Sequence, residues 1–162
     1  MKKLILTLAL IGTVITVQAQ SKSVKALYEK YKSEDDFFHM ELGGNFMNFA
    51  NGFKIDIDEN DMATVAKSIE KLNFFTLPDH ADDALLEYKT LQKGLERERY
   101  ELLMEASEGK KGGVMVYSKG GNKISDLVVL VGGDDGDLIV VELKGSFDQE
   151  LVAKAANYKG RN

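Results

Sequence analysis

The second half of the chain alternates between apolar, β-branched runs and short glycine-rich breaks. The runs lie at residues 114–118, 124–131 and 138–143, and the breaks between them read Lys-Gly-Gly-Asn-Lys and Gly-Gly-Asp-Asp-Gly-Asp. Runs of this length bounded by glycine, asparagine and aspartate are typical of strands joined by hairpin turns. Residues 102–106 alternate in polarity and predict one more strand, although they could instead prolong a preceding helix. The pattern predicts a four-stranded antiparallel meander.

The rest of the chain supplies elements that can cover this meander. The runs at 124–131 and 138–143 are apolar on both faces, which predicts central strands with helices packed on them. Two more strands are expected at 36–42 and 72–77, in the first half of the chain. Helical spacing of apolar residues predicts helices over 21–32, over 46–53, from Asp58 to Ile69, over 81–97 and after Asp148.

These elements are expected to form one domain, because 162 residues fit the size of one globular domain, roughly 100 to 200 residues. The predicted fold class is α+β. A single twisted, mostly antiparallel sheet joins the C-terminal four-strand meander to two N-terminal strands and carries packed helices. In the first predicted strand, Phe38, Met40 and Leu42 share one face, and His39 and Glu41 share the other.

The first residues have the pattern of a secretory signal peptide. Residues 1–3 are Met-Lys-Lys, residues 4–17 form an apolar run, and residues 17–19 supply small side chains for cleavage. The run is shorter than the roughly 20 apolar residues of a membrane span. We therefore expect a signal peptide at 1–19 and a single exported domain at 20–162, periplasmic or secreted, with no transmembrane segment after cleavage. Since no Cys follows the run, no lipid anchor is expected there.

Charge and cysteine content exclude several classes of function. Removing Lys2 and Lys3 from the 21 basic residues leaves 19 against 26 acidic ones, a formal net charge of −7 for the predicted mature chain. An acidic surface of this kind disfavours nucleic-acid binding, which depends on cations that neutralise phosphates. The chain has no Cys, so disulfides, thiolate catalysis and Cys-ligated zinc are excluded.

One acidic segment resembles part of a calcium-binding loop. Asp56, Asp58 and Asn60 match the first oxygen-ligand positions of such a loop. The position that needs glycine holds Asp61, and the position that needs a bidentate Glu holds Lys67. The segment therefore predicts a strand-to-helix loop with an N-cap at Asp58, and no metal.

Two further groups are candidates for metal or acid-base chemistry. Asp134, Asp135 and Asp137 crowd one glycine-rich loop, but a hairpin turn between flanking strands demands the same residue types. His39 and Glu41 project from one strand face without a third ligand nearby in the sequence. We expect a turn and a half-buried structural histidine, with no metal and no cofactor.

Aromatic residues are concentrated in the first half of the chain. Seven of the eight Phe lie in the region 37–75. Because buried aromatics dominate cores, most of them are predicted to be core, including Phe38 and Phe74. The alternative is an apolar groove or exposed patch that receives a lipid, a peptide or a partner helix. The candidates for that surface are Phe46, Met47, Phe49 and Phe53.

Three segments carry a resemblance to a known family. Residues 27–31 read Leu-Tyr-Glu-Lys-Tyr, residues 100–104 read Tyr-Glu-Leu-Leu-Met, and residues 143–148 read Leu-Lys-Gly-Ser-Phe-Asp at the end of the meander. With these, the chain resembles an exported bacterial family catalogued as domain of unknown function 4252 (DUF4252). The resemblance implies a fold and an export route, and it assigns no catalytic or binding residue.

The sequence favours a binding role over an enzymatic one. It contains no Gly-x-Ser-x-Gly elbow, phosphate loop or dinucleotide fingerprint. The leading hypothesis is an exported, non-enzymatic envelope protein that serves as a protein-interaction or structural module. The alternative is a binder of a small apolar ligand or peptide through residues 37–75, and a hydrolase using His39 with carboxylates ranks third. The identity of an envelope partner and the oligomeric state stay open.

Overall fold

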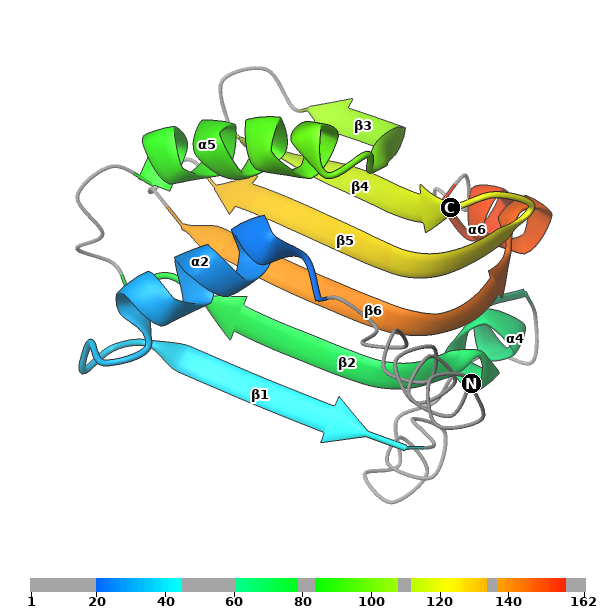
Figure 1. Cartoon of the computed structure of the whole chain (residues 1–162), viewed down its shortest axis with the longest axis horizontal. Helices are drawn as coiled ribbons and strands as arrows, with labels where there is room; N and C mark the ends of the chain where they lie inside the picture. The colour runs from blue at the N-terminus through cyan, green and yellow to red at the C-terminus, as the bar shows by residue number, and fades with distance from the viewer. Residues whose placement is uncertain (1–19, 45–60, 79–83, 108–111, 134–136, 157–162) are drawn as a thin grey trace, which may run out of the picture.

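The computed structural model describes residues 20–44, 61–78, 84–107, 112–133 and 137–156 (Figure 1). With the labels of Figure 1, the elements in chain order are α2 (Lys22–Tyr31), β1 (Phe38–Gly43), α4 (Asp61–Lys67), β2 (Ile69–Thr76), α5 (Ala84–Arg97), β3 (Glu101–Ser107), β4 (Gly112–Gly120), β5 (Lys123–Gly133), β6 (Leu138–Asp148) and α6 (Gln149–Ala156). The predicted α+β fold is confirmed.

The strands form one six-stranded sheet in the order β1-β2-β6-β5-β4-β3, and every neighbouring pair is antiparallel. The four-strand meander is confirmed, with β5 and β6 at the centre of the sheet as their two-sided apolar patterns predict. β2 pairs with both β1 and β6, so the N-terminal strand pair extends the meander on the side of β6.

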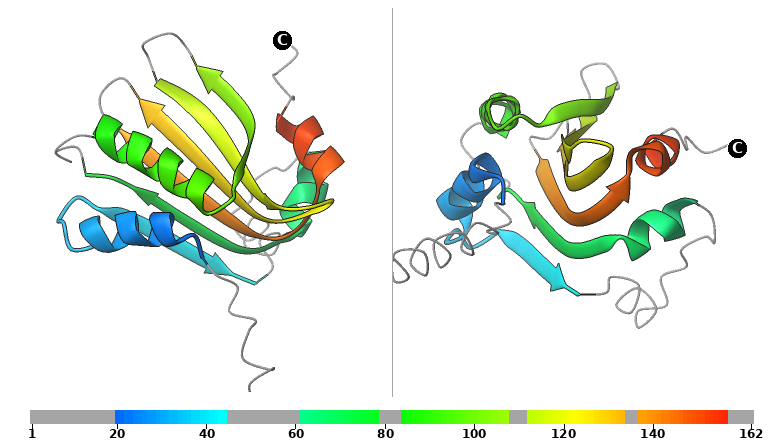
Figure 2. Two further views of the ribbon diagram at one scale, coloured as in Figure 1. Left: turned by 45° about the horizontal axis from the view of Figure 1, so that its top comes forward. Right: turned by 45° about the vertical axis from the view of Figure 1, so that its right-hand side comes forward.

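Helices α2 and α5 lie side by side across one face of the sheet, here called the inner face (Figures 1 and 2). Val24, Leu27 and Tyr31 are among the apolar residues whose spacing predicts α2. All three are buried, so this side of the helix packs on the sheet. The same core takes Leu91 and Leu95 from α5. Its sheet side chains are Phe75, Tyr117, Val128, Leu130, Leu138 and Val140. Burial of this apolar area is what holds the two helices on the sheet.

The two inner-face helices approach each other closely at Gly94. A Cβ placed there would lie 2.1 Å from Ser23 Oγ and 2.7 Å from Ser23 Cβ, so only glycine lets α5 pass α2 at this separation. At the other end of the contact, the Tyr31 hydroxyl donates to Glu87 Oε1 at 3.1 Å, and Lys30 forms an ion pair with the same carboxylate. Packing and polar contacts therefore fix the two helices in one arrangement.

The opposite face of the sheet, here called the outer face, has a smaller core at one end. Val65 of α4 and Val152 of α6 pack there against strand residues that include Leu127 and Leu143. The helix expected after Asp148 is α6, and Asp148 caps it, because its Oδ1 accepts the backbone N–H of Glu150 at 2.9 Å. Figures 1 and 2 show α4 and α6 together at the end of the strands where β6 finishes.

Of three expectations about individual elements, one is corrected, one is decided and one lies outside the described residues. The helix expected to reach Ile69 ends at Lys67, since Ser68 donates its N–H to the Val65 carbonyl and its hydroxyl to the Thr64 carbonyl. Ile69 instead begins β2. The segment that could have prolonged a helix is strand β3. The short helix expected at 46–53 lies outside the described residues.

The prediction that Phe38 is core is wrong. Its side chain is 55% exposed, whereas Phe75 is fully buried at 0%. The physical reason is position: Phe38 lies on β1, an edge strand of the described sheet, and faces the outer side, where its ring contacts that of Phe74. Phe74, also predicted as core, faces the same side and is only partly buried.

Candidate functional site

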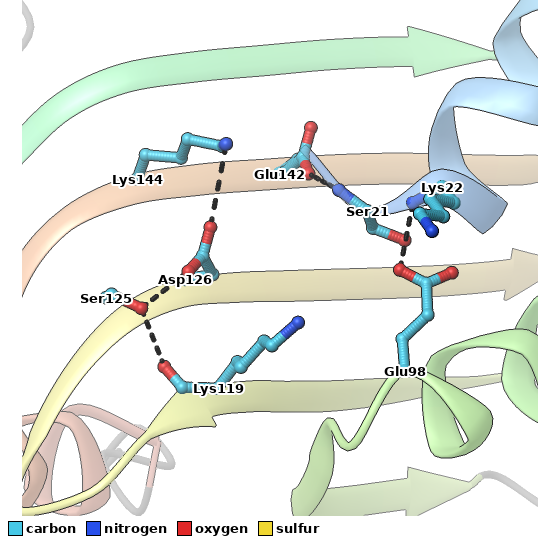
Figure 3. Close-up of polar contacts among 8 residues, drawn as sticks. All are labelled: Ser21, Lys22, Glu98, Lys119, Ser125, Asp126, Glu142 and Lys144. Carbon is cyan, nitrogen blue, oxygen red and sulfur yellow. Dashed lines mark hydrogen bonds and ion pairs between the residues drawn. The ribbon is translucent and has the colours of Figure 1, made fainter. Parts of the chain in front are cut away.

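Charged and amide side chains run across the inner face beyond the ends of α2 and α5. The pairing register aligns Lys71 of β2, Lys144 of β6, Asp126 of β5 and Lys119 of β4 in one transverse row. One step further along the strands, Asn73 of β2 pairs with Glu142 of β6. Figure 3 shows the part of this polar row that lies on β4, β5 and β6.

Several members of the polar row are buried. Glu142 is 2% exposed, and Asn73 and Lys144 are also buried. Lys144 Nζ lies 3.7 Å from Asp126 Oδ1, and Lys71 Nζ lies 2.9 Å from Glu41 Oε1. Removing a charge from water costs several kcal/mol, and the Lys144–Asp126 contact offsets part of that penalty because both side chains are largely buried. The Lys71–Glu41 pair is about half exposed and incurs little of it.

A pocket opens among these residues. It has a volume of about 220 Å³ and is lined by Gln20, Lys71, Asn73, Glu142 and Lys144. Four of the five come from β2 and β6, and Gln20 comes from the segment directly before α2. The lining is polar and carries both signs of charge, so the pocket suits a small polar or charged group and does not suit an apolar ligand.

Helix α2 begins at this pocket, and two carboxylates from distant segments hold its first N–H groups. The Ser21 N–H donates to Glu142 Oε1 at 3.0 Å, and Ser21 is only 1% exposed. Glu98, just after α5, accepts the N–H of Lys22 at 2.8 Å (Figure 3) and also that of Ser23 at 2.7 Å. A helix N-terminus carries unpaired N–H groups and partial positive charge, so these carboxylates anchor the chain at Ser21.

The two anchoring carboxyls have opposite pKa shifts. Burial raises the pKa of Glu142, against the Ser21 N–H, the charge of Lys144 and the side chains of Gln20 and Asn73, which all favour the ionised form. Burial alone would raise the pKa of Glu98 as well, but the hydrogen bonds from Ser23 and Lys22 outweigh it and lower that pKa. Glu142 is therefore the carboxylate whose charge is less well compensated.

The outer face is apolar over much of its area. In the middle of the sheet, one side chain from each strand lines up in register across the sheet. These are Met40, Phe74, Val141, Val129, Val116 and Met104. All but Val116 are only partly buried. Phe38 lies at the β1 edge, with its ring centroid 5.8 Å from that of Phe74 in an edge-on arrangement.

Comparison with known proteins places the chain by its sequence. Residues 31–155 match the profile of a family described as a domain of unknown function, DUF4252. The chain belongs to this family. Among curated proteins and solved structures, none matches the chain. The match covers every strand of the sheet and the whole of α5, but it begins at the last residue of α2.

In this DUF4252 domain, His39 and Glu41 face the inner side of β1 together, as predicted, but each has its own partner. His39 Nε2 lies 2.8 Å from Asn73 Oδ1, and its ring centroid lies 4.7 Å from that of Tyr28. Glu41 pairs with Lys71. The geometry gives His39 a packing and hydrogen-bonding role at the rim of the polar row.

One buried hydroxyl of this DUF4252 domain also lies near the polar row. Tyr100 Oη is the buried side-chain polar atom that lacks a hydrogen-bond partner among the described residues. Burial raises its pKa, and the charges of Asp126, Glu142 and Glu98 add to that effect. Lys119 Nζ lies 5.1 Å from the centre of its ring. Tyr100 is therefore a neutral hydroxyl beside several charges.

Several predicted positions lie outside the described residues of the domain. They are Phe46, Met47, Phe49 and Phe53 of the candidate apolar surface, and Asp56, Asp58, Asn60, Asp134 and Asp135 of the acidic loops. Within the described residues, no group of three or more His, Asp and Glu side chains is arranged to hold a metal ion. None of the helices in the described part of the chain is both long and apolar enough to cross a membrane.

The sequence did contain a signal for the polar row. Residues 124–131 and 138–143 were predicted to be central strands covered on both faces, and each run contains or adjoins a charged residue. Asp126, Glu142 and Lys144 must then be buried or aligned with one another. The sequence did not reveal that β2 is the partner strand of β6. The two strands are separated by 61 residues, which include α5 and strands β3, β4 and β5.

Proposed function

We propose that this protein is an exported, non-enzymatic interaction module that acts in the periplasm or outside the cell and binds a protein partner along β1. The observation that carries the proposal is the exposure of Phe38, 55%, on the outermost strand of the described sheet. Met40 and Leu42 follow it on the same outer face. Exposed apolar side chains in a contiguous group are typical of interaction surfaces.

The geometry favours a partner segment that lies along the strand. Alternate residues of β1 present apolar side chains on one face, and the pairing groups on one edge of β1 bond to β2. A protein segment that adds to such an edge gains main-chain hydrogen bonds and side-chain contacts at every second residue. Phe38 next to Phe74 supplies the aromatic anchor that hot spots of interfaces commonly contain.

The alternatives draw on the same region with a different occupant or chemistry. A small apolar ligand needs an enclosed apolar cavity. The pocket described above is polar and is lined by charged residues, and the candidates Phe46, Met47, Phe49 and Phe53 lie outside the described residues. A hydrolase needs a base held near a nucleophile, whereas His39 is engaged by Asn73 and packs on Tyr28. The contacts of His39 support the interaction module over a hydrolase.

Site-specific photo-crosslinking tests the partner surface. A photoreactive amino acid is placed at Leu42, and the matched control is placed at Lys93, an exposed position on α5 at the inner side. We expect a defined protein adduct from position 42 in envelope fractions, absent from position 93. Phe38→Asp in the same chain removes the aromatic anchor and is expected to abolish the adduct. Equal adducts from both positions, unaffected by Phe38→Asp, contradict the proposed surface.

Export is tested separately. The basic start, the short apolar run and the small residues at 17–19 support removal of residues 1–19. Mass spectrometry of periplasmic or secreted material is expected to give an N-terminus at Gln20. Chains that begin at Met1 and sediment with membranes contradict export by this route.

A further inference from the structure

The charges around the pocket leave one carboxylate without a full counter-charge. Lys144 lies 3.7 Å from Asp126, and Lys71 lies 2.9 Å from Glu41, so each lysine of the lining has a carboxylate of its own. Glu142, at 2% exposure, receives the neutral Ser21 N–H and the neutral side chains of Gln20 and Asn73, together with the charge of Lys144. These two lysines stand against three carboxylates, and Lys119 and Glu98 add one charge of each sign, so one positive group at the pocket would balance the set.

A nitrogen of the chain itself lies next to this carboxylate. The Ser21 nitrogen is 3.0 Å from Glu142 Oε1. The Gln20 nitrogen belongs to the preceding residue, so covalent geometry keeps it within about 4 Å of the Ser21 nitrogen. Gln20 also lines the pocket. In a chain that begins at Gln20, this nitrogen is an α-amino group, which is protonated below a pKa of roughly 7.7–8.0.

We propose that the polar pocket is the binding site for the protein's own N-terminal ammonium group, which forms when the leader is removed after Ala19, with Glu142 as its counter-ion. The inference rests on the proposed export and cleavage. In the uncleaved chain the same nitrogen is an uncharged amide, so the ion pair cannot form. Cleavage thereby completes the pocket and stabilises the folded domain.

The anchoring of α2 makes this site specific. Glu98 holds the N–H groups of Lys22 and Ser23 independently of Glu142. Ser21 is 1% exposed and leaves little room for the chain to shift along the sheet. The amino group is therefore presented to Glu142 by a segment that is already ordered, which lowers the entropic cost of forming a buried ion pair.

A double-mutant cycle on purified chains of defined N-terminus tests the proposal. Four chains start at Gln20: the free amine and the N-acetylated form, each with Glu142 and with Glu142→Gln. Thermal midpoints are measured near pH 6, where the amine is protonated, and mass spectrometry confirms that Gln20 has not cyclised. We expect acetylation to lower the midpoint by a few degrees with Glu142 and to have no effect with Glu142→Gln.

Glu98→Gln is the matched control, because Glu98 is also a carboxylate at the start of α2. It is expected to lower the midpoint equally in the free and acetylated chains. The proposal is overturned if acetylation costs as much with Glu142→Gln as with Glu142, or if the acetylated chain is the more stable one. Since these chains are made with a defined start, the cycle tests ammonium binding independently of cellular cleavage. An uncleaved native protein contradicts the export proposal, and with it the occupation of the pocket in the native protein, whatever the cycle shows.

Discussion

The two faces of the sheet differ in an unexpected way: the helix-covered inner face buries charged side chains, and the outer face leaves aromatic side chains partly exposed. The inner face, under α2 and α5, takes in Glu142, Lys144 and Asn73 alongside its apolar core. The outer face leaves Phe38 exposed and Phe74 only partly buried. Burying charged side chains and exposing apolar ones both lower the stability of a fold. The polar row on the inner face and the region around Phe38 on the outer face are therefore the parts of the domain where a role other than folding is indicated.

Adjacent residues on β2 allow the largest test of this comparison. Phe75 points into the inner core at 0% exposure, and its neighbour Phe74 points outward. Phe75→Ala is expected to lower the free energy of unfolding by about 3–5 kcal/mol, because it removes a fully buried ring and leaves a cavity. Phe74→Ala is expected to cost clearly less. Denaturant titration measures both, and equal losses would show that the two faces are covered alike.

The second-largest expected loss of stability comes from disturbing the packing of α2 against α5 on the inner face. Gly94→Ala places a methyl group 2.7 Å from Ser23 Cβ, so the two helices must move apart. The expected loss is about 1–3 kcal/mol, typical of overpacking in a well-packed core. Ser23→Gly in the same chain removes the clash and is expected to restore part of the stability. A Gly94→Ala chain with an unchanged denaturation midpoint would contradict the close helix contact.

The pH dependence separates the two carboxylates that hold α2. The pKa of Glu98 is lowered in the folded state, so its contribution to stability is present above pH 4.5, its ordinary pKa, and is lost as the pH falls through the lower folded pKa. Glu98→Gln is therefore expected to destabilise the domain at pH 7 and to converge with the parent chain in acid. Denaturant midpoints across this pH range measure the difference.

Glu142 is expected to behave in the opposite way in the N-acetylated chain. Its pKa is raised in the folded state, so the folded state loses stability as the pH rises from 4.5 to the raised folded value. Glu142→Gln removes that loss, so its midpoint relative to the parent should rise over this range. A fall in relative midpoint would show that the carboxylate is better compensated than its surroundings indicate.

The faces also differ in how far they could be predicted from sequence. Local patterns were sufficient for the meander, for α2 and for the alternation of Phe38, His39 and Met40 along β1, because each depends on residues close in the chain. The pairing of β2 with β6 depends on contacts far apart in the sequence, so the alignment of Asn73 with Glu142 could not be predicted. The burial of Phe38 was predicted wrongly, because composition does not reveal which face the helices cover.

Substitution of Phe38 has the smallest expected effect on stability and is the most direct test of whether this part of the outer face is uncovered. Phe38→Asp places a charge where the structure has a side chain that is 55% exposed. If this part of the outer face is open to solvent, the free energy of unfolding of the domain changes by no more than about 1 kcal/mol, as for other surface substitutions. A loss as large as that of Phe75→Ala would show that Phe38 is covered in the folded domain and would contradict the account of the two faces.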